Sequence, residues 1–217
     1  MAELKFLKKE AIASGWNAFK SQKGMFIGIV FISALFYIIP NFLQDNLKDA
    51  QILAALIGVA AWVLQSAIAM GMARVSLQVT DKGSSSVSEL FSCFSLLLKY
   101  IAASVLYGLM VFIGMILLIV PGIIVAMRGQ FFVYYIIDEG AGPIEALKKS
   151  FEITKGSVVN LLLLSLVTIL LNIVGVLAIG LGIFVSIPIT LVAYAFVYRK
   201  LNPVSPEEAF SPTEPAV

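Results

Sequence analysis

The residue of this sequence best placed for chemistry is Arg128, which stands inside the apolar stretch Gly122–Ile137. An arginine at membrane depth costs at least about 2.5 kcal/mol on insertion scales, so it should face a bundle interior, a water-filled cavity or a lipid headgroup. Two interpretations stay open. Arg128 could bind an anionic substrate or a lipid phosphate, or it could be a structural arginine bonded to carbonyl and amide groups of neighbouring helices.

Other polar side chains in the apolar stretches could complete a site around this arginine. The candidate ligand-binding residues are Arg128, Gln65, Asn160 and Asn172. A second group lies where the stretch that holds Arg128 is expected to meet the cytoplasm. Its acidic residues could bind a cation, pair with lysines further along the chain, or form a solvated helix end. The candidate cluster consists of Asp138, Glu139, Lys148, Lys149 and Lys155.

The residue types that many catalytic and metal sites need are scarce. The sequence contains no histidine and one cysteine, Cys93. These counts exclude histidine-based acid–base catalysis, Ser-His and Cys-His nucleophiles, imidazole metal sites and an intrachain disulfide. No cluster of acid, base and nucleophile lies within the apolar stretches either. We therefore expect no enzyme activity, no metal and no cofactor.

The composition indicates that membrane helices carry these residues. Hydrophobic residues make up 60% of the 217 residues and charged residues 13%, whereas soluble domains have about 45–50% and about 25%. Apolar runs of about 20 residues are typical of membrane spans. The net charge of +2 gives no reason to expect a nucleic-acid partner. The predicted fold class is an all-α integral membrane protein with six transmembrane helices, and the alternative is four spans with re-entrant segments.

The predicted membrane domain covers residues 24–201, with amphipathic cytoplasmic helices at 1–23, 86–95 and 142–155. Pro40 and Asn41 should stop the first span, and Pro121-Gly122 should separate the third from the fourth. Segment 202–217 is rich in proline and glutamate, which predicts a disordered cytoplasmic tail. The six spans are expected at about Met25–Ile39, Ile52–Ala73, Tyr100–Val120, Gly122–Ile137, Val158–Leu177 and Ile183–Val197.

The distribution of basic residues predicts the orientation. If the N-terminus is inside, every lysine and arginine except Lys48 and Arg128 falls on the inner side of the six spans. Cytoplasmic loops carry the excess of basic residues in membrane proteins. Both termini are therefore expected in the cytoplasm, with the protein in the inner (plasma) membrane.

The chain also shows the outline of an internal repeat. Three copies of one unit, an amphipathic cytoplasmic helix followed by a span out and a span back, would account for the six spans. Aromatic side chains mark the three amphipathic segments: Trp16 and Phe19, Phe91 and Phe94, and Phe151. Because each unit would begin and end inside, the copies would be parallel. The alternative is that any six-span protein with short outer turns has this layout.

The stretch Pro121–Leu201 carries a resemblance to a known group. The segments PGIIVAMRGQFFVYYIIDEGAGPIEALKKSFEITKG and GLGIFVSIPITLVAYAFVYRKL resemble bacterial six-span membrane proteins that include the membrane domain beside some glycerophosphoryl diester phosphodiesterases. In that group the phosphodiesterase chemistry belongs to a separate soluble domain, so the resemblance implies a bacterial inner-membrane protein without an established activity.

Three functions follow from these observations. The first is transport of, or binding to, a small anionic or lipid ligand, with Arg128 contacting the anionic group. The second is a non-catalytic membrane-organising or partner-binding component, in which helices 2–23 and 142–155 contact anionic lipid. An intramembrane enzyme ranks last. The expected partners are membrane lipids and either another membrane protein or a second copy of the chain.

Overall fold

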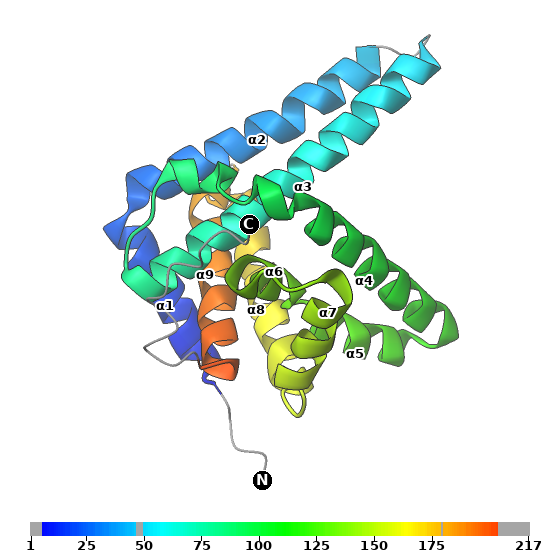
Figure 1. The fold of residues 1–217 in the computed structure, drawn as a ribbon. Helices are drawn as coiled ribbons and strands as arrows, with labels where there is room; N and C mark the ends of the chain where they lie inside the picture. Colours follow the sequence, from blue (N-terminus) through cyan, green and yellow to red (C-terminus); the bar gives the residue numbers. More distant parts are fainter. Residues whose placement is uncertain (1–5, 47–49, 179, 204–217) are drawn as a thin grey trace, which may run out of the picture.

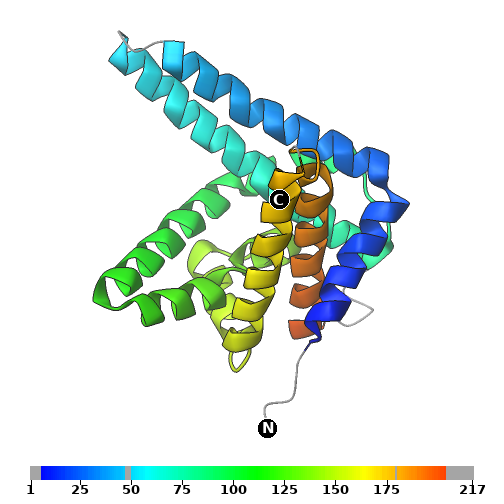
Figure 2. The same cartoon turned by 180° about the vertical axis from the view of Figure 1, so that it is seen from behind.

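The computed structural model describes residues 6–46, 50–178 and 180–203, and these residues form helices and connecting turns without a strand. Three helical hairpins dominate the arrangement (Figure 1). They point in clearly different directions and do not form one parallel bundle, as the reverse view also shows (Figure 2). The hairpins are α2 (Lys23–Asn46) with α3 (Gln51–Lys82), α4 (Leu97–Leu117) with α5 (Ile119–Gly129), and α8 (Val158–Leu177) with α9 (Ile183–Leu201).

Shorter helices precede or join the hairpins. Two of the three predicted amphipathic segments are α-helical, whereas the segment at 86–95 forms two short 3-10 helices. The segment at 86–95 contains four serines, which compete for backbone hydrogen bonds and lower helix propensity. The connecting elements are α1 (Lys8–Ser21), η1 (Val87–Phe91), η2 (Phe94–Leu96), α6 (Phe132–Glu139) and α7 (Pro143–Ile153).

Six helices of the described chain are long and apolar enough to cross a membrane, which agrees with the six predicted stretches. The fourth runs over Ile119–Glu139 and includes both α5 and α6. In the first three, the most apolar 18-residue windows have only 17%, 17% and 11% of their residues buried inside the protein. Most of the surface of these helices is therefore open to a surrounding medium or partner.

Several predicted boundaries are wrong. Helix α2 continues through Pro40 to Asn46, and α3 extends past Ala73 to Lys82. The second hairpin turns at Leu118, while Pro121 lies in the first turn of α5, where its missing N–H would have no partner anyway. The fourth stretch is broken between Gly129 and Phe132. The predicted tail mostly lies outside the described residues, as do residues 1–5.

The centre of the molecule is a layer of aromatic side chains between α3, α6 and α9. Tyr198 is fully buried and stacks on Tyr134, with ring centroids 5.0 Å apart. Phe131 is also fully buried and lies 6.3 Å from the Tyr198 ring. Such stacked rings bury large areas in fixed geometry. They fill the space between the three helices with side chains.

Two close backbone approaches hold the short elements on the hairpins. A Cβ on Gly71 of α3 would collide with the carbonyl oxygen of Leu90 in η1. A Cβ on Gly15 of α1 would collide with the backbone of Ile189 in α9. The apolar face of α1 is thus occupied by α9, with Ala11, Gly15 and Phe19 buried.

We predict that Gly71→Ala destabilises the protein by about 1–3 kcal/mol, because the added methyl group meets backbone atoms that cannot rotate away. The matched control is Gly108→Ala in α4, where a Cβ meets nothing within 4 Å, so this change should be neutral or slightly stabilising. Unfolding of both variants in detergent measures the difference. Equal stability of the two variants would contradict the close approach of α3 and η1.

Candidate functional site

Arg128 lies in the last turn of α5 and reaches α7. Its Nη2 donates a hydrogen bond of 2.7 Å to the carbonyl oxygen of Phe151, and the guanidinium carbon lies 5.1 Å from the centre of the Phe151 ring. Phe151 is in the last turn of α7, where carbonyls lack partners within the helix and carry partial negative charge. The arginine therefore caps the C-terminus of α7.

The helix break beside Arg128 is closed by side chains of α7. The hydroxyl of Ser150 donates to the carbonyl oxygen of Arg128 at 2.7 Å and accepts from the N–H of Phe131 at 3.1 Å. The hydroxyl of Thr154, the residue after α7, lies 3.2 Å from the same carbonyl and donates over a shorter distance, 2.7 Å, to the carbonyl of Ser150. Both hydroxyl residues are fully buried. Since unpaired buried backbone groups cost free energy comparable to a lost hydrogen bond, these contacts make the break tolerable.

These contacts favour the structural interpretation of Arg128. One group remains: Nε of Arg128 is buried and has no hydrogen-bond partner among the described residues. The guanidinium of Arg128 is therefore held within the fold by the hydrogen bond of Nη2, while its Nε–H can still donate a hydrogen bond.

The other candidate ligand-binding residues lie on different parts of the hairpins. Gln65 is in α3, and Asn160 and Asn172 are 12 residues apart on α8, which corresponds to about 18 Å along the helix. Within the described chain, none of the three amides forms a hydrogen bond with Arg128. The structure does not join the four residues by hydrogen bonds, and their role in ligand binding stays a prediction.

Asn172 borders a groove of about 350 Å³ between α8 and α9. Its Nδ2 donates to the carbonyl of Thr168 at 2.7 Å and to the hydroxyl of Thr190 at 3.0 Å. Its amide hydrogens are thus used within the hairpin, and the groove presents mainly apolar side chains. Its other lining residues are Val176, Ile183, Ile187, Thr190 and Leu191.

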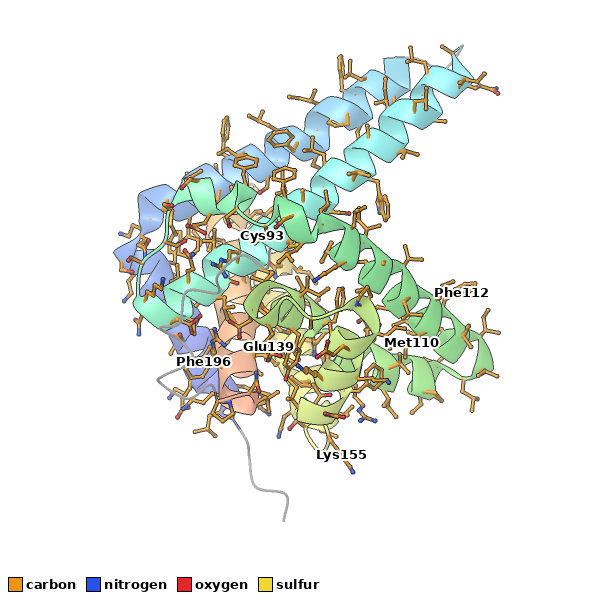
Figure 3. The ribbon with its side chains drawn as sticks, in the orientation of Figure 1. Cys93, Met110, Phe112, Glu139, Lys155 and Phe196 are labelled. Carbon is orange, nitrogen blue, oxygen red and sulfur yellow. The ribbon has the colours of Figure 1, made fainter. Side chains whose placement is uncertain are left out.

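The predicted polar cluster divides into two parts. Lys149 pairs with Glu139 at 2.6 Å and with Glu145 at 2.9 Å. The hydrogen bonds that Lys149 donates to Glu139 and, to a smaller extent, to Glu145 raise the pKa of Lys149, and the same contact lowers the pKa of Glu145. Lys148 is exposed, and Lys155 points away from Glu139 at the turn before α8 (Figure 3).

Asp138 has a partner that the sequence analysis missed, Arg199 near the end of α9. Two guanidinium nitrogens donate to Asp138, at 2.5 and 2.9 Å. Arg199 also donates to both carboxylate oxygens of Asp81, at 2.8 and 2.6 Å. Such bidentate pairs are the strongest ion-pair geometry. The hydroxyl of Tyr198 adds a 3.1 Å bond to Asp138. We call Asp81, Asp138 and Arg199 the Arg199 cluster.

The Arg199 cluster is well shielded for groups near a helix end. The side chains of Arg199, Asp138 and Asp81 are 17%, 18% and 29% exposed. A signal existed in the sequence, since VTDKG at 79–83 and IIDEG at 136–140 place an aspartate identically at the end of an apolar stretch. Its partner could not be identified from spacing because Arg199 is 61 residues from Asp138 and 118 from Asp81.

The polar side chains around Arg128 and in the Arg199 cluster form structural contacts, and they do not form a recognisable set of catalytic groups. Among the described residues, no group of three or more His, Cys, Asp or Glu side chains could hold a metal ion. Both aspartates of the Arg199 cluster are held by one guanidinium, so neither is a free general base.

We predict that Arg128→Leu lowers stability by about 1.5–3 kcal/mol, because it removes a charge-assisted hydrogen bond to the end of α7. Lys148→Gln, which removes an exposed positive charge on the same helix, should stay within about 0.5 kcal/mol of wild type. Denaturant titration in detergent compares the two. Unchanged stability in Arg128→Leu would remove the structural role and favour a ligand role.

Comparisons with known proteins leave the activity open. An uncharacterized protein of Mycobacterium tuberculosis (Rv2560) and one of Mycobacterium bovis (Mb2590) are each 31% identical to this chain over 104 residues. The matched segment covers 48% of this chain and only 32% of each relative. No solved structure matches the chain significantly. None of these matches links it to the phosphodiesterase membrane domain. Over residues 24–217 it matches one family model, and the chain belongs to that family, described as Domain of unknown function (DUF7847).

Proposed function

We propose that the protein is a non-catalytic, multi-pass inner-membrane component that organises anionic lipid at its cytoplasmic face. The observation that carries this proposal is a basic stripe on α1 and the start of α2, which remains exposed after α1 has packed on α9. The stripe consists of Lys9, Trp16, Lys20 and Lys23.

Exposed apolar side chains support the membrane setting. Phe42 near the end of α2 is 67% exposed, Ile52 at the start of α3 81%, and Ile116 near the end of α4 68%. Contiguous apolar surface on this scale would aggregate in water, whereas lipid tails cover it without cost. The side chains along α4 project from the hairpin, Phe112 among them (Figure 3).

The chemistry of the basic stripe suits an anionic bilayer surface. The ammonium group of Lys20 lies 5.4 Å from the centre of the Trp16 ring, so a cation and an amphipathic ring are presented together. Tryptophan is enriched at membrane interfaces, and each lysine near an anionic membrane surface contributes about 1 kcal/mol to the free energy of binding to that surface.

Helix α7 is less suited to the same task. Its four charged residues, Glu145, Lys148, Lys149 and Glu152, sum to zero, whereas Lys8, Lys9, Glu10 and Lys20 of α1 sum to +2. Lys149 is also held by two carboxylates. The proposed lipid contact is therefore assigned to α1 rather than to both helices.

Binding or transport of an anion at Arg128 is the second candidate function. The observation that favours it is the Nε of Arg128, which has no hydrogen-bond partner among the residues that the structure describes. The buried aromatic layer between α3, α6 and α9 argues against a polar path through the centre of the described helices.

We predict that the triple variant Lys9→Gln, Lys20→Gln, Lys23→Gln binds phosphatidylglycerol about tenfold less than wild type does, because it loses three lipid-facing charges. Native mass spectrometry of protein released from mixed phosphatidylglycerol and phosphatidylcholine nanodiscs measures the retained lipid. A second triple variant, Lys82→Gln, Lys148→Gln, Lys200→Gln, removes the same charge from other exposed positions. If both variants lose lipid equally, the stripe has no special role. A discrete anion lost only in Arg128→Leu would favour the second candidate.

The proposed orientation needs a placed cysteine, because Cys93 is only 5% exposed and would react poorly wherever it lay. In a Cys93→Ser background, we predict that a membrane-impermeant thiol reagent labels Asn41→Cys on intact cells. Lys148→Cys should react only after permeabilisation, because the proposed orientation has α7 on the inner side. The reverse pattern of labelling would invert the proposed topology.

A further inference from the structure

We propose that the chain consists of three units arranged cyclically, and that the Arg199 cluster is the central joint that sets the angles between their hairpins. The proposal concerns the described helices and does not depend on which ligand the protein binds. Each unit would begin with a short element and continue into one hairpin, over residues 8–82, 87–139 and 143–201.

The packing of the short elements recurs three times. The short element of each unit packs on the second helix of the unit before it: η1 on α3, α7 on α5 and α6, and α1 on α9. It also touches the first helix of that preceding hairpin, as η1 does with α2, α7 with α4 and α1 with α8. The contacts of α1 join the last unit to the first, so the three units form a closed ring.

The hairpins touch one another in the same cyclic order. The second helix of each hairpin contacts the first helix of the next: α3 with α4, α5 with α8, and α9 with α2. A six-helix protein with arbitrary packing would not be expected to repeat each kind of contact around a ring. The layout inferred from the sequence is thereby matched by a pattern of contacts between elements far apart in the chain.

Residue register supports the same equivalence. Asp81, Asp138 and Arg199 each lie at the end of a second helix, and the positions ten residues earlier are Gly71, Arg128 and Ile189. Each of these earlier positions is where the next short element crosses. Gly71 meets the backbone of Leu90, Ile189 meets that of Gly15, and Arg128 bonds to the carbonyl of Phe151.

The joint is formed by the three equivalent positions themselves. Three aspartates meeting at one point would repel one another, and arginine in the third unit replaces that repulsion by two bidentate ion pairs. One planar guanidinium thus joins the ends of α3, α6 and α9. Lysine could not do the same, because its ammonium is a point charge without a fork of donors.

The joint has consequences for movement. The helix ends are fixed by the cluster and by the aromatic layer of Tyr134 and Tyr198 beside it. Among the described residues, the outer ends of the hairpins hold no comparable ion pair, and the first two hairpins point apart (Figure 1). A change at the joint would therefore be amplified along the hairpins into a change in the distance between their tips.

The test measures that distance. Spin labels at Asn41→Cys and Ile116→Cys, in the Cys93→Ser background, report the separation of the first two hairpin tips by pulsed electron resonance. Arg199→Ala should broaden the distribution of distances and lower the unfolding midpoint by roughly 5–15 °C, because two aspartates then face each other without a counter-charge. Exchanging the charges in Asp81→Arg with Arg199→Asp should restore both values towards wild type, since the positions are equivalent.

Two further variants keep the test decisive. If Arg199→Ala does not fold, Arg199→Lys keeps the charge but loses the paired geometry, and it should show an intermediate broadening. Lys149→Ala breaks a neighbouring ion pair outside the joint and should leave the distances unchanged. Wild-type distances in Arg199→Ala or Arg199→Lys would overturn the joint. A charge exchange that folds but stays as broad as the single variant would overturn the equivalence of the three positions.

Discussion

The guanidinium of Arg199 is the contact on which the arrangement of the three hairpins depends. It is the place where the ends of α3, α6 and α9 are bonded to one another, and it does so with four hydrogen bonds to two carboxylates. Helices α2, α3 and α4 bury few of the residues in their most apolar windows, so apolar packing on these helices cannot fix their angles as it does in a compact bundle. The directional, shielded ion pairs of Arg199 with Asp81 and Asp138 therefore have a large influence on the angles between the hairpins.

A second constraint acts at the break in the fourth apolar stretch. Interrupting a helix frees backbone groups, and in an apolar medium each of them needs a partner from the protein. The hydroxyl of Ser150 in α7 provides these partners, with the hydroxyl of Thr154 3.2 Å from the same carbonyl, and Arg128 caps α7 in return. The two elements stabilise each other, so the arginine that draws attention as a ligand site has a demonstrable task within the fold. Its Nε has no partner in the part of the chain that the structure describes, which leaves room for an additional acceptor.

Taken together, these features favour a protein that works through its surfaces. The centre is filled with tyrosine and phenylalanine, and the shielded charges there neutralise one another apart from one carboxylate. The surfaces, in contrast, are chemically distinct: wide apolar faces on the hairpins and lysines around Trp16 on α1. A lipid-organising role uses both surfaces, whereas transport would require a path that the aromatic layer obstructs.

The sequence by itself determined the features that depend only on neighbouring residues or on composition. Runs of about 20 apolar residues gave the six long helices, and the lack of histidine excluded whole classes of site, because both properties are read over short windows or by counting. Tertiary structure decided the rest. Pro40 did not end α2, and the fourth stretch broke beside Arg128 because α7 can satisfy the freed groups there. Asp138 pairs with Arg199 and not with the nearby lysines, because the packing of α6 against α9 brings together two residues that are 61 positions apart in the sequence. No local sequence pattern predicts a contact over that separation.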